Sequence, residues 1–178
     1  PVRFRVLNAN NDRALNLQLY KAYEKTGWTP AVPATATTQY IPGTPTLPCT
    51  TVTGCTEVKM VPVSLNTPNQ FADTASGIPD PGQAGPPWIQ IGTEGGFMPA
   101  PVVVPQQPIG FNLNTGQFAF GIVNQHSLYL LPAERADVIV DFTGLSGQTL
   151  ILYNDAPAPV PAGAAVYDFY TGDGDQTF

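Results

Sequence analysis

The strongest constraint on the fold is a period of two in the hydrophobicity of several short segments. In residues 2–6 three apolar side chains alternate with two arginines, and in residues 15–19 three leucines alternate with Asn16 and Gln18. Successive side chains of a β-strand point to opposite faces, so this period is typical of strands with one face in a core and the other in water. The Asn-rich residues 8–12 suit a turn between the two strands.

Glycine and proline divide much of the remaining chain into similarly short segments. The 178 residues include 20 prolines and 17 glycines, and proline interrupts both helices and central strands. The pair Gly95 and Gly96 is expected to form a tight turn that needs a positive φ. Further strands are expected at residues 88–91, 102–104, 118–123, 127–131, 137–142 and 149–153, with a weaker one at 165–170. This pattern predicts an all-β protein, an antiparallel sandwich or barrel.

A long stretch at about 21–87 lacks the period of two. It contains eleven of the 20 prolines and many threonines, and only the segment TEVKMVPVSL suggests a strand. Loops of that length are uncommon within compact domains. We interpret the stretch as an irregular Pro/Thr-rich insertion, because the strand patterns on either side of it are each too few to close a sandwich. Residues 1–178 would then form a single domain, and the alternative is a linker between two domains.

The charge of the chain argues against a nucleic-acid partner. The net charge is −6, with six basic and five acidic residues up to Gln90, but only Arg135 against eight acids from Ile91 onward. Phosphate binding requires clustered Lys and Arg, and the sequence has no such cluster.

No apolar run approaches the roughly 20 residues of a membrane-spanning helix. The sequence starts directly on a strand pattern, so we interpret it as a fragment of a longer polypeptide.

The two cysteines, Cys49 and Cys55, enclose the short loop TTVTG. We favour a disulfide between them, which would contribute roughly 2 kcal/mol by the entropy of closing so small a loop. Free thiols are the alternative. A zinc site would need four ligands, and His126 is the one imidazole in the sequence. A disulfide would indicate an oxidising compartment.

The segment LPAERADVIVDF, residues 131–142, holds four charged side chains in a chain with only 11% charged residues. The carboxylate of Glu134 with that of Asp137 or Asp141 could in principle form the acid pair of a glycoside hydrolase. Arg135 between them would lower the pKa of both, whereas a general acid needs a raised pKa. We therefore interpret Glu134, Arg135 and Asp137 as structural residues, with Arg135 tying the entrance of the strand to the preceding turn.

Two other polar segments are weaker candidates for chemistry. His126 and Ser127 are neighbours at a strand entrance, where successive side chains point to opposite faces, so they do not suit a catalytic dyad. The segment TGDGDQT at 171–177 begins like a calcium loop but lacks the further oxygen ligands of a complete site. We interpret it as part of an acidic C-terminal tail at about 168–178. No catalytic, cofactor-binding or metal-ligating residue is expected in this chain.

Four segments of the chain closely resemble, in order, the middle cupredoxin-like domain of three-domain multicopper oxidases: RFRVLNANNDRALNLQL, WIQIGTEGGFMPAPV, LYLLPAERADVIVDFTG and TLILYNDAPAPVPAG. Within that family the segments resemble the laccase, bilirubin oxidase, phenoxazinone synthase and bacterial manganese-oxidase group. The closing YDFYTGDGDQT is similar to a stretch that follows this domain in the larger bacterial members. The resemblance implies a cupredoxin-like Greek-key β-sandwich, and the insertion at about 21–87 has no matching motif.

The resemblance also implies a copper-containing parent enzyme. Such an enzyme takes electrons singly from a substrate at a mononuclear copper and reduces dioxygen to water at a trinuclear copper cluster. These centres need His-x-His pairs and a cysteine flanked by histidines. The present chain has one histidine and two cysteines, so no copper ligand of the family can be carried onto it. In the family the first and third domains supply the ligands, and the middle domain spaces them and helps wall the substrate site.

The first hypothesis is therefore a copper-free middle domain of an exported multicopper oxidase that oxidises a phenolic or metal-ion substrate. The isolated segment would be inactive, its partners would be the flanking cupredoxin domains of the same protein, and it would be secreted, periplasmic or at the cell surface. The acidic C-terminal half fits a cationic substrate, but solubility explains it equally well. The alternative is a stand-alone extracellular β-sandwich with a binding or structural role.

Overall fold

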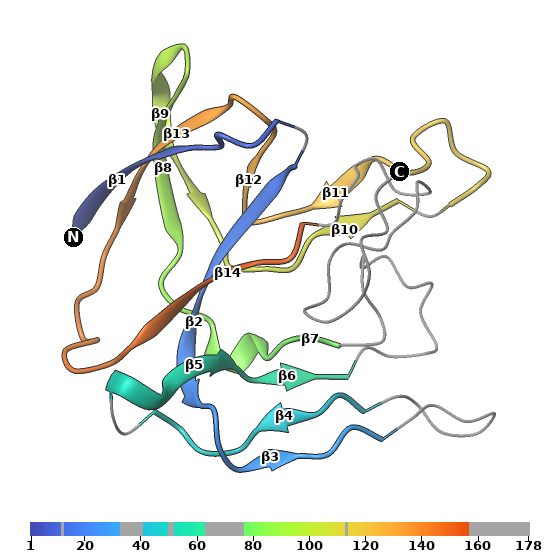
Figure 1. Cartoon of the computed structure of the whole chain (residues 1–178). Helices are drawn as coiled ribbons and strands as arrows, with labels where there is room; N and C mark the ends of the chain where they lie inside the picture. The colour runs from blue at the N-terminus through green and yellow to red at the C-terminus, as the bar shows by residue number, and fades with distance from the viewer. Residues whose placement is uncertain (12, 33–40, 50–51, 63–76, 113, 157–178) are drawn as a thin grey trace.

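A computed structural model describes residues 1–11, 13–32, 41–49, 52–62, 77–112 and 114–156. Its regular structure is almost entirely antiparallel β (Figure 1). The larger strands are β1 (Val2–Leu7), β2 (Leu15–Glu24), β5 (Cys55–Val58), β8 (Trp88–Thr93), β9 (Gly96–Val104), β13 (Arg135–Val140) and β14 (Leu150–Asn154). The smaller elements are β3 (Trp28–Thr29), β4 (Thr44–Pro45), η1 (Val52–Gly54), β6 (Met60–Val61), β7 (Ile78–Pro79), η2 (Pro81–Gln83), β10 (Gly110–Phe111), β11 (Val123–Gln125) and β12 (Leu128–Leu130).

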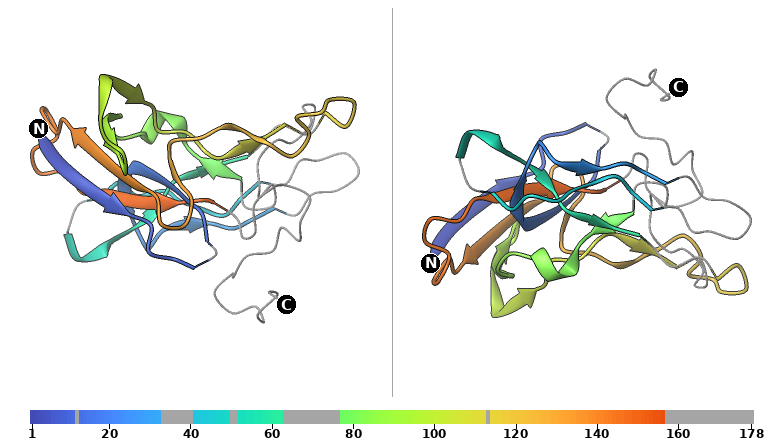
Figure 2. Two further views of the ribbon diagram at one scale, coloured as in Figure 1. Left: turned by 90° about the horizontal axis from the view of Figure 1, so that it is seen from above. Right: turned by 90° about the horizontal axis from the view of Figure 1, so that it is seen from below.

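Two sheets form the sandwich, and the all-β prediction is confirmed. The first sheet has the strand order β1-β13-β8-β9, and the second has the order β12-β2-β14, with β5 also paired to β2. All of these pairings are antiparallel. The N-terminus and the loop that joins β10 to β11 lie at opposite ends of the molecule in every view (Figure 2).

The core lies between these two sheets. Its buried residues are Leu17 and Leu19 of β2, Leu128 and Leu130 of β12, Trp88 of β8, and Ala136, Val138 and Val140 of β13. Each strand contributes every second residue, as the period of two predicts. The Trp88 indole also donates a hydrogen bond to the Leu17 carbonyl oxygen, 3.0 Å away, which links the two sheets.

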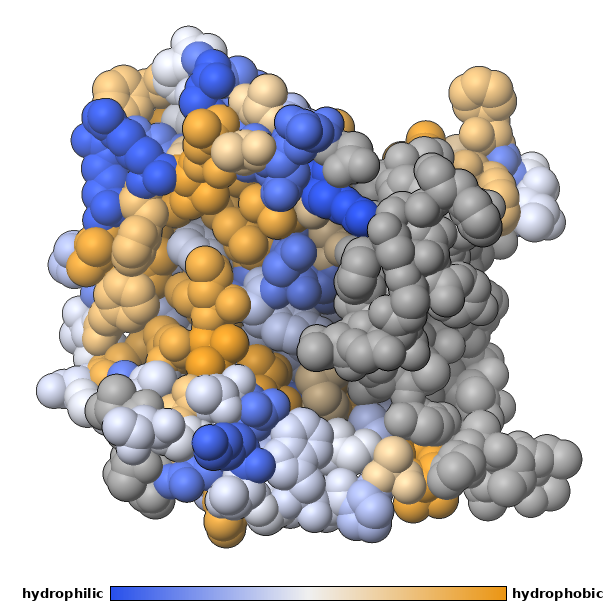
Figure 3. Space-filling model, viewed as in Figure 1, coloured by the Kyte–Doolittle hydropathy of each residue, from blue (hydrophilic) through white to orange (hydrophobic). Residues whose placement is uncertain are grey.

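The sandwich is not closed on every side. Apolar side chains remain visible between β1 and β14 in the space-filling view (Figure 3). Val2 and Phe4 of β1 lie opposite the fully buried Val140 and Val138, so they point toward the core side of the first sheet. Even so, 47% of Val2 and 39% of Phe4 stay exposed. The edge strand β1 thus has an inner face that the second sheet does not cover.

The stretch expected to be irregular from residue 21 begins inside a strand. β2 continues to Glu24, because Lys21 pairs with Leu150 of β14 and Ala22 pairs with Val58 of β5. The segment TEVKMVPVSL does contain strands, β5 and β6, as expected. The short strand pairs β3–β4 and β6–β7 also lie within this stretch. Part of this stretch is therefore joined directly to the central strand of the second sheet.

One expected strand is wrong. Residues 118–123 form a series of turns, in which the amides of Phe120 and Ile122 donate to the carbonyl oxygens of Gln117 and Ala119. Gly121 has a φ of 81°, a value that a strand does not use. The actual strand, β11, starts only at Val123. Apolar alternation was misleading because these side chains have no sheet to pack on, and Phe118 is fully exposed.

Two further expectations concern turns and the C-terminus. The hairpin turn between β8 and β9 contains Gly95, and the expected positive φ is found at Gly96, with a value of 111°. The Gly95 amide donates to the Thr93 hydroxyl, 3.3 Å away. The expected strand at 165–170 and the acidic tail at 168–178 lie outside the described residues.

Candidate functional site

The motif LPAERADVIVDF starts with a tight turn that is fixed from two sides. Pro132 and Ala133 occupy its centre, and the positive φ of Ala133, 67°, fits the third position of a type II turn. The Glu134 amide donates to the Leu131 carbonyl at 3.0 Å, while the Glu134 carboxylate accepts from the Leu131 amide at 2.6 Å. Asn8 bonds the same turn through its own amide and carbonyl. Glu134 is therefore bound to backbone, which is a structural use of its charge.

Asp137 is held by arginines of a different strand. The Arg3 Nε donates to Asp137 Oδ1 at 2.7 Å, and the second nitrogen of the same guanidinium binds Oδ2. Arg5 lies directly opposite Asp137 in the β1–β13 pair, with its Nε 3.8 Å from Oδ2. The hydrogen bond from Arg3 lowers the pKa of Asp137 below its usual range. Asp137 is thus kept ionised and does not suit the role of a general acid.

Arg135 links the start of β13 to the preceding turn, as expected, but it is not the cation beside Asp137. Among the described residues, the cations paired with Asp137 are Arg3 and Arg5. Arg135 and Asp137 are two positions apart on one strand, whereas residues across the strand pair come closer. The Arg135 Nη1 donates to the Ala133 carbonyl at 3.4 Å, and its amide donates to the Glu94 carboxylate at 3.2 Å.

A shallow depression of about 260 Å³ lies beside these charges. It is bounded by Arg5 and Leu7 of β1, by Arg135 and Asp137 of β13, and by Glu94 at the β8–β9 turn. Hydrogen bonds from backbone amides, its own and that of Arg135, lower the pKa of Glu94. The depression therefore offers guanidinium groups and ionised carboxylates at a surface, which suits binding of a charged chain.

A second polar cluster lies on the other face of β2. The sequence pattern placed Asn16 and Gln18 on the water side, but both are fully buried, so this expectation is wrong. Their amide nitrogens each donate to Asp155 Oδ1 at 2.7 Å, and the Ile109 amide donates to Oδ2 at 2.8 Å. The Tyr20 hydroxyl donates to Gln18 at 2.8 Å. The segments around residues 106–109 and 155–156 cover this face.

Asp155 is a partly buried acid whose hydrogen-bond donors are neutral amides. Burial raises its pKa to about 6, although the hydrogen bonds from Asn16, Ile109 and Gln18 act in the opposite direction. Sequence patterns give little warning of this residue, since it follows β14 in a loop. The signal that existed is the alternation of Asn16, Gln18 and Tyr20, because a buried polar face requires a polar partner.

The His126 ring and the Ser127 hydroxyl do not hydrogen-bond to each other. The His126 Nδ1 lies 2.7 Å from the Ser127 carbonyl oxygen, so Nδ1 carries the hydrogen in that contact. The Ser127 hydroxyl donates instead to the Gln106 side chain at 3.2 Å, and Ser127 is buried. The His126 ring lies 5.7 Å from that of Tyr129, centroid to centroid. Both residues are therefore engaged in packing around the start of β12.

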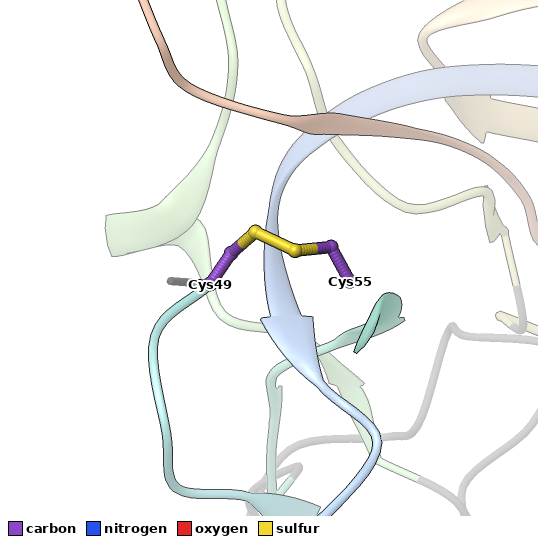
Figure 4. Close-up of a disulfide and its surroundings, with 2 residues drawn as sticks. All are labelled: Cys49 and Cys55. Carbon is purple, nitrogen blue, oxygen red and sulfur yellow. A yellow bond between two sulfur atoms is a disulfide. The ribbon is translucent and has the colours of Figure 1, made fainter. Parts of the chain in front are cut away.

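Cys49 and Cys55 form a disulfide, as favoured from the sequence (Figure 4). It joins two segments that lie on either side of the end of β2. Pro48 forms a bridge with Tyr23, and Cys55 pairs with Glu24. The disulfide thus fastens part of the Pro/Thr-rich stretch to the second sheet, and bonds of this kind are typical of proteins from oxidising compartments.

The donor set of this chain does not fit a copper centre. Copper sites of the expected kind use several imidazoles and a thiolate, whereas the sequence has one histidine, and both sulfurs are oxidised. Within the described ranges, no group of three or more His, Cys, Asp or Glu side chains could hold a metal ion. The segment TGDGDQT, considered as a calcium loop, lies outside those ranges.

The described part of the chain also contains no helix with the length and apolarity needed to cross a membrane.

Comparison with known proteins gives one partial similarity. The chain is 34% identical over 68 residues to a laccase of Bacillus stratosphericus, and the match covers 38% of this chain and 9% of the laccase. No family model matches the chain, and no solved structure matches it. The chain therefore spans a small part of that relative, and the similarity supports a link to multicopper oxidases at a coarse level.

Proposed function

We propose that this chain is a copper-free middle domain, with a cupredoxin-like Greek-key sandwich, of an exported multicopper oxidase. The observation that carries the proposal is the similarity to a laccase in a chain whose own residues cannot supply the copper ligands. A domain of such an enzyme that supplies no copper ligands contributes through its structure, because the ligands must come from elsewhere in the protein. The disulfide supports export, since it is stable in an oxidising compartment.

In this role the domain acts as a spacer and as a wall of the substrate site. The two sheets are joined by the buried core and by the hydrogen bond from Trp88 to Leu17, which makes the sandwich a stiff unit. A stiff unit can hold two copper-bearing neighbours at a fixed separation. The copper centres supply the electron transfer and the reduction of dioxygen, and this chain supplies neither. The substrate of the parent enzyme is a phenol or a metal ion.

Reading the coding sequence on both sides of this segment tests the proposal. We expect His-x-His pairs on each side and, on one side, a cysteine flanked by histidines. A start codon and an export signal immediately before Pro1, without histidine-rich flanks, would contradict it. That result would favour the alternative of a stand-alone extracellular β-sandwich with a binding or structural role.

Copper titration of the 178-residue chain provides an independent test. The chain is expected to retain no stoichiometric copper after gel filtration, as measured by mass spectrometry of the metal. A His126→Ala variant serves as the matched control for adventitious binding to the single imidazole. A stoichiometric, intensely blue centre in the unmodified chain would refute the copper-free assignment.

A further inference from the structure

We propose that the free edge of β1 is a docking site for an extended polypeptide segment in which acidic and apolar residues alternate. The segment would come from outside residues 1–178 and would add to the first sheet as a further strand. The docking edge is defined here as β1 with its exposed inner residues Val2 and Phe4 and its outward-facing Arg5. The inference does not depend on copper chemistry or on the parent enzyme proposed above.

The first observation is that no strand among the described residues pairs with the outer backbone edge of β1. In the sheet order β1-β13-β8-β9, β1 is terminal. The Asn8 amide donates to the Glu134 carbonyl at 3.0 Å, in line with the pairing register. Bonded residues alternate along an antiparallel pair, so the amides and carbonyls of Arg3, Arg5 and Leu7 point away from β13. An exposed strand edge of this kind can pair with another chain.

The second observation is that the sandwich is open along this edge. Val2 and Phe4 point to the core side but stay 47% and 39% exposed. Across the opening, Leu152 of β14 lies opposite Leu19, a core residue, and is 59% exposed. Figure 3 shows apolar atoms gathered between the two strands. A strand added to β1 would extend the first sheet over this opening, so its inner side chains would have to be apolar.

The third observation concerns the charge on the outer face of the same strand. Arg3 already binds Asp137 through two nitrogens, while the Arg5 side chain is 78% exposed and only 3.8 Å from the same carboxylate. Arg5 also bounds the depression of about 260 Å³. A carboxylate on an added strand would lie directly beside Arg5. The outer side chains of the docking segment are therefore expected to be acidic.

The paired side of β1 shows the same chemistry. β13 places the apolar Val138 and Val140 inward and Asp137 outward, opposite Arg5. A segment with the same alternation as β13 could pair with the free edge of β1 in the way that β13 pairs with its other edge. This internal example defines the chemistry of the partner: an extended peptide with aliphatic residues on one face and aspartate or glutamate on the other.

A second copy of the chain fits the edge poorly. A two-fold antiparallel pairing of β1 with itself, centred at residue 3, 4 or 5, places an arginine opposite an arginine. Like charges directly opposite each other on one face destabilise a strand pair. Charge complementarity thus favours an acidic partner over self-association.

A binding experiment with a short peptide tests the proposal. The probe is a fluorescent, end-capped peptide with the sequence ADVIVD, which is that of residues 136–141. Two control peptides carry AKVIVK, or ADVIVD with N-methylated backbone nitrogens. The ADVIVD peptide is expected to bind the 178-residue chain, and the lysine and N-methylated peptides to bind at least roughly tenfold more weakly. Hydrogen exchange should slow at the amides of Arg3, Arg5 and Leu7.

Variants of the chain locate the contact. Arg5→Glu is expected to weaken ADVIVD binding by roughly tenfold or more, because it places an acid beside the acids of the probe. Lys25→Glu makes the same charge change at an exposed site outside the docking edge and should leave the affinity within about twofold. Leu152→Asp tests the opening and should also weaken binding. Circular dichroism verifies that each variant is folded.

Three results would overturn the proposal. Equal binding of the lysine peptide would show that charge complementarity plays no part. Equal binding of the N-methylated peptide would exclude strand addition. A stable dimer of the chain in sedimentation, dissociated by Phe4→Asp, would show that a second copy occupies the edge. Each of these results leaves the copper titration and the flanking sequence unaffected, so failure here is distinguishable from failure of the proposed function.

Discussion

Replacement of the partly buried Asp155 by asparagine should change how the stability of the protein depends on pH. In the folded protein the carboxylate is surrounded by neutral donors from Asn16, Gln18 and Ile109. Burial raises its pKa to about 6 from the ordinary value of 3.8. The folded state therefore prefers the protonated acid more strongly than the unfolded chain does.

The size and direction of the effect follow from this pKa. A raised pKa in the folded state means that Asp155 favours folding fully below about pH 4, and that this contribution is lost as the pH rises through about 6. The increase from 3.8 to about 6 corresponds to about 3 kcal/mol at 1.36 kcal/mol per pKa unit. Asp137, Glu94 and Asp141 have lowered pKa values. Their contribution is present above the ordinary pKa and is lost as the pH falls.

Urea unfolding of the original chain and of Asp155→Asn between pH 4 and pH 8 isolates the contribution of Asp155. The acids with lowered pKa values are present in both proteins, so their effects cancel in the difference of the two unfolding free energies. Asparagine does not titrate, and its amide meets the Ile109 amide at a pH-independent cost. The original chain should lose roughly 2 kcal/mol relative to Asp155→Asn from pH 4 to pH 7, which is less than the full value of about 3 kcal/mol because the unfolded carboxyl is already partly ionised at pH 4.

A difference that stays constant, or that grows with pH, would refute this reasoning. If Asp155→Asn does not fold, the carbon-13 shift of the Asp155 carboxyl in the original chain gives the same information. A titration midpoint near 6 supports the prediction. A midpoint below about 4, the value of an exposed aspartate, contradicts it.

Three further perturbations have defined outcomes. Arg3→Ala should lower the midpoint of thermal unfolding more than Arg135→Ala, because Arg3 binds Asp137; equal effects would contradict the assignment. Val138→Ala in the core should cost about 2 kcal/mol in urea unfolding, and a cost near zero would show that the core is not packed there. Replacing both cysteines, Cys49→Ser with Cys55→Ser, should lower the free energy of unfolding by roughly 2 kcal/mol. A reduced original chain that is as stable as the oxidised one would contradict this.

The alternation of apolar residues was enough to locate most of the core strands. It identified β1, β8, β12, β13 and β14 to within a few residues, because each of these strands has one face in the shared core. It failed where the environment of the second face mattered. Asn16 and Gln18 alternate with leucines as water-facing residues would, but another segment of the chain covers them with a carboxylate.

The charged motif shows a similar limit. The sequence indicated that Glu134, Arg135 and Asp137 lie close together, and it favoured Arg135 as their common partner. The partner of Asp137 is Arg3, which lies 134 residues earlier in the chain. Local spacing cannot reveal such a contact, because it arises only from the register of β1 against β13.

The pairing of the first strand with β13 also sets the timing of assembly on the ribosome. During synthesis, β1 emerges more than a hundred residues before the strand that it pairs with. At the usual translation rates of roughly 5–20 residues per second, β1 waits on the order of ten seconds with both of its edges unpaired. Contacts between such distant segments also form slowly, because a long loop must close. The nascent chain is thus exposed to wrong pairing at β1 during this time, and a chaperone that binds β1 would reduce it.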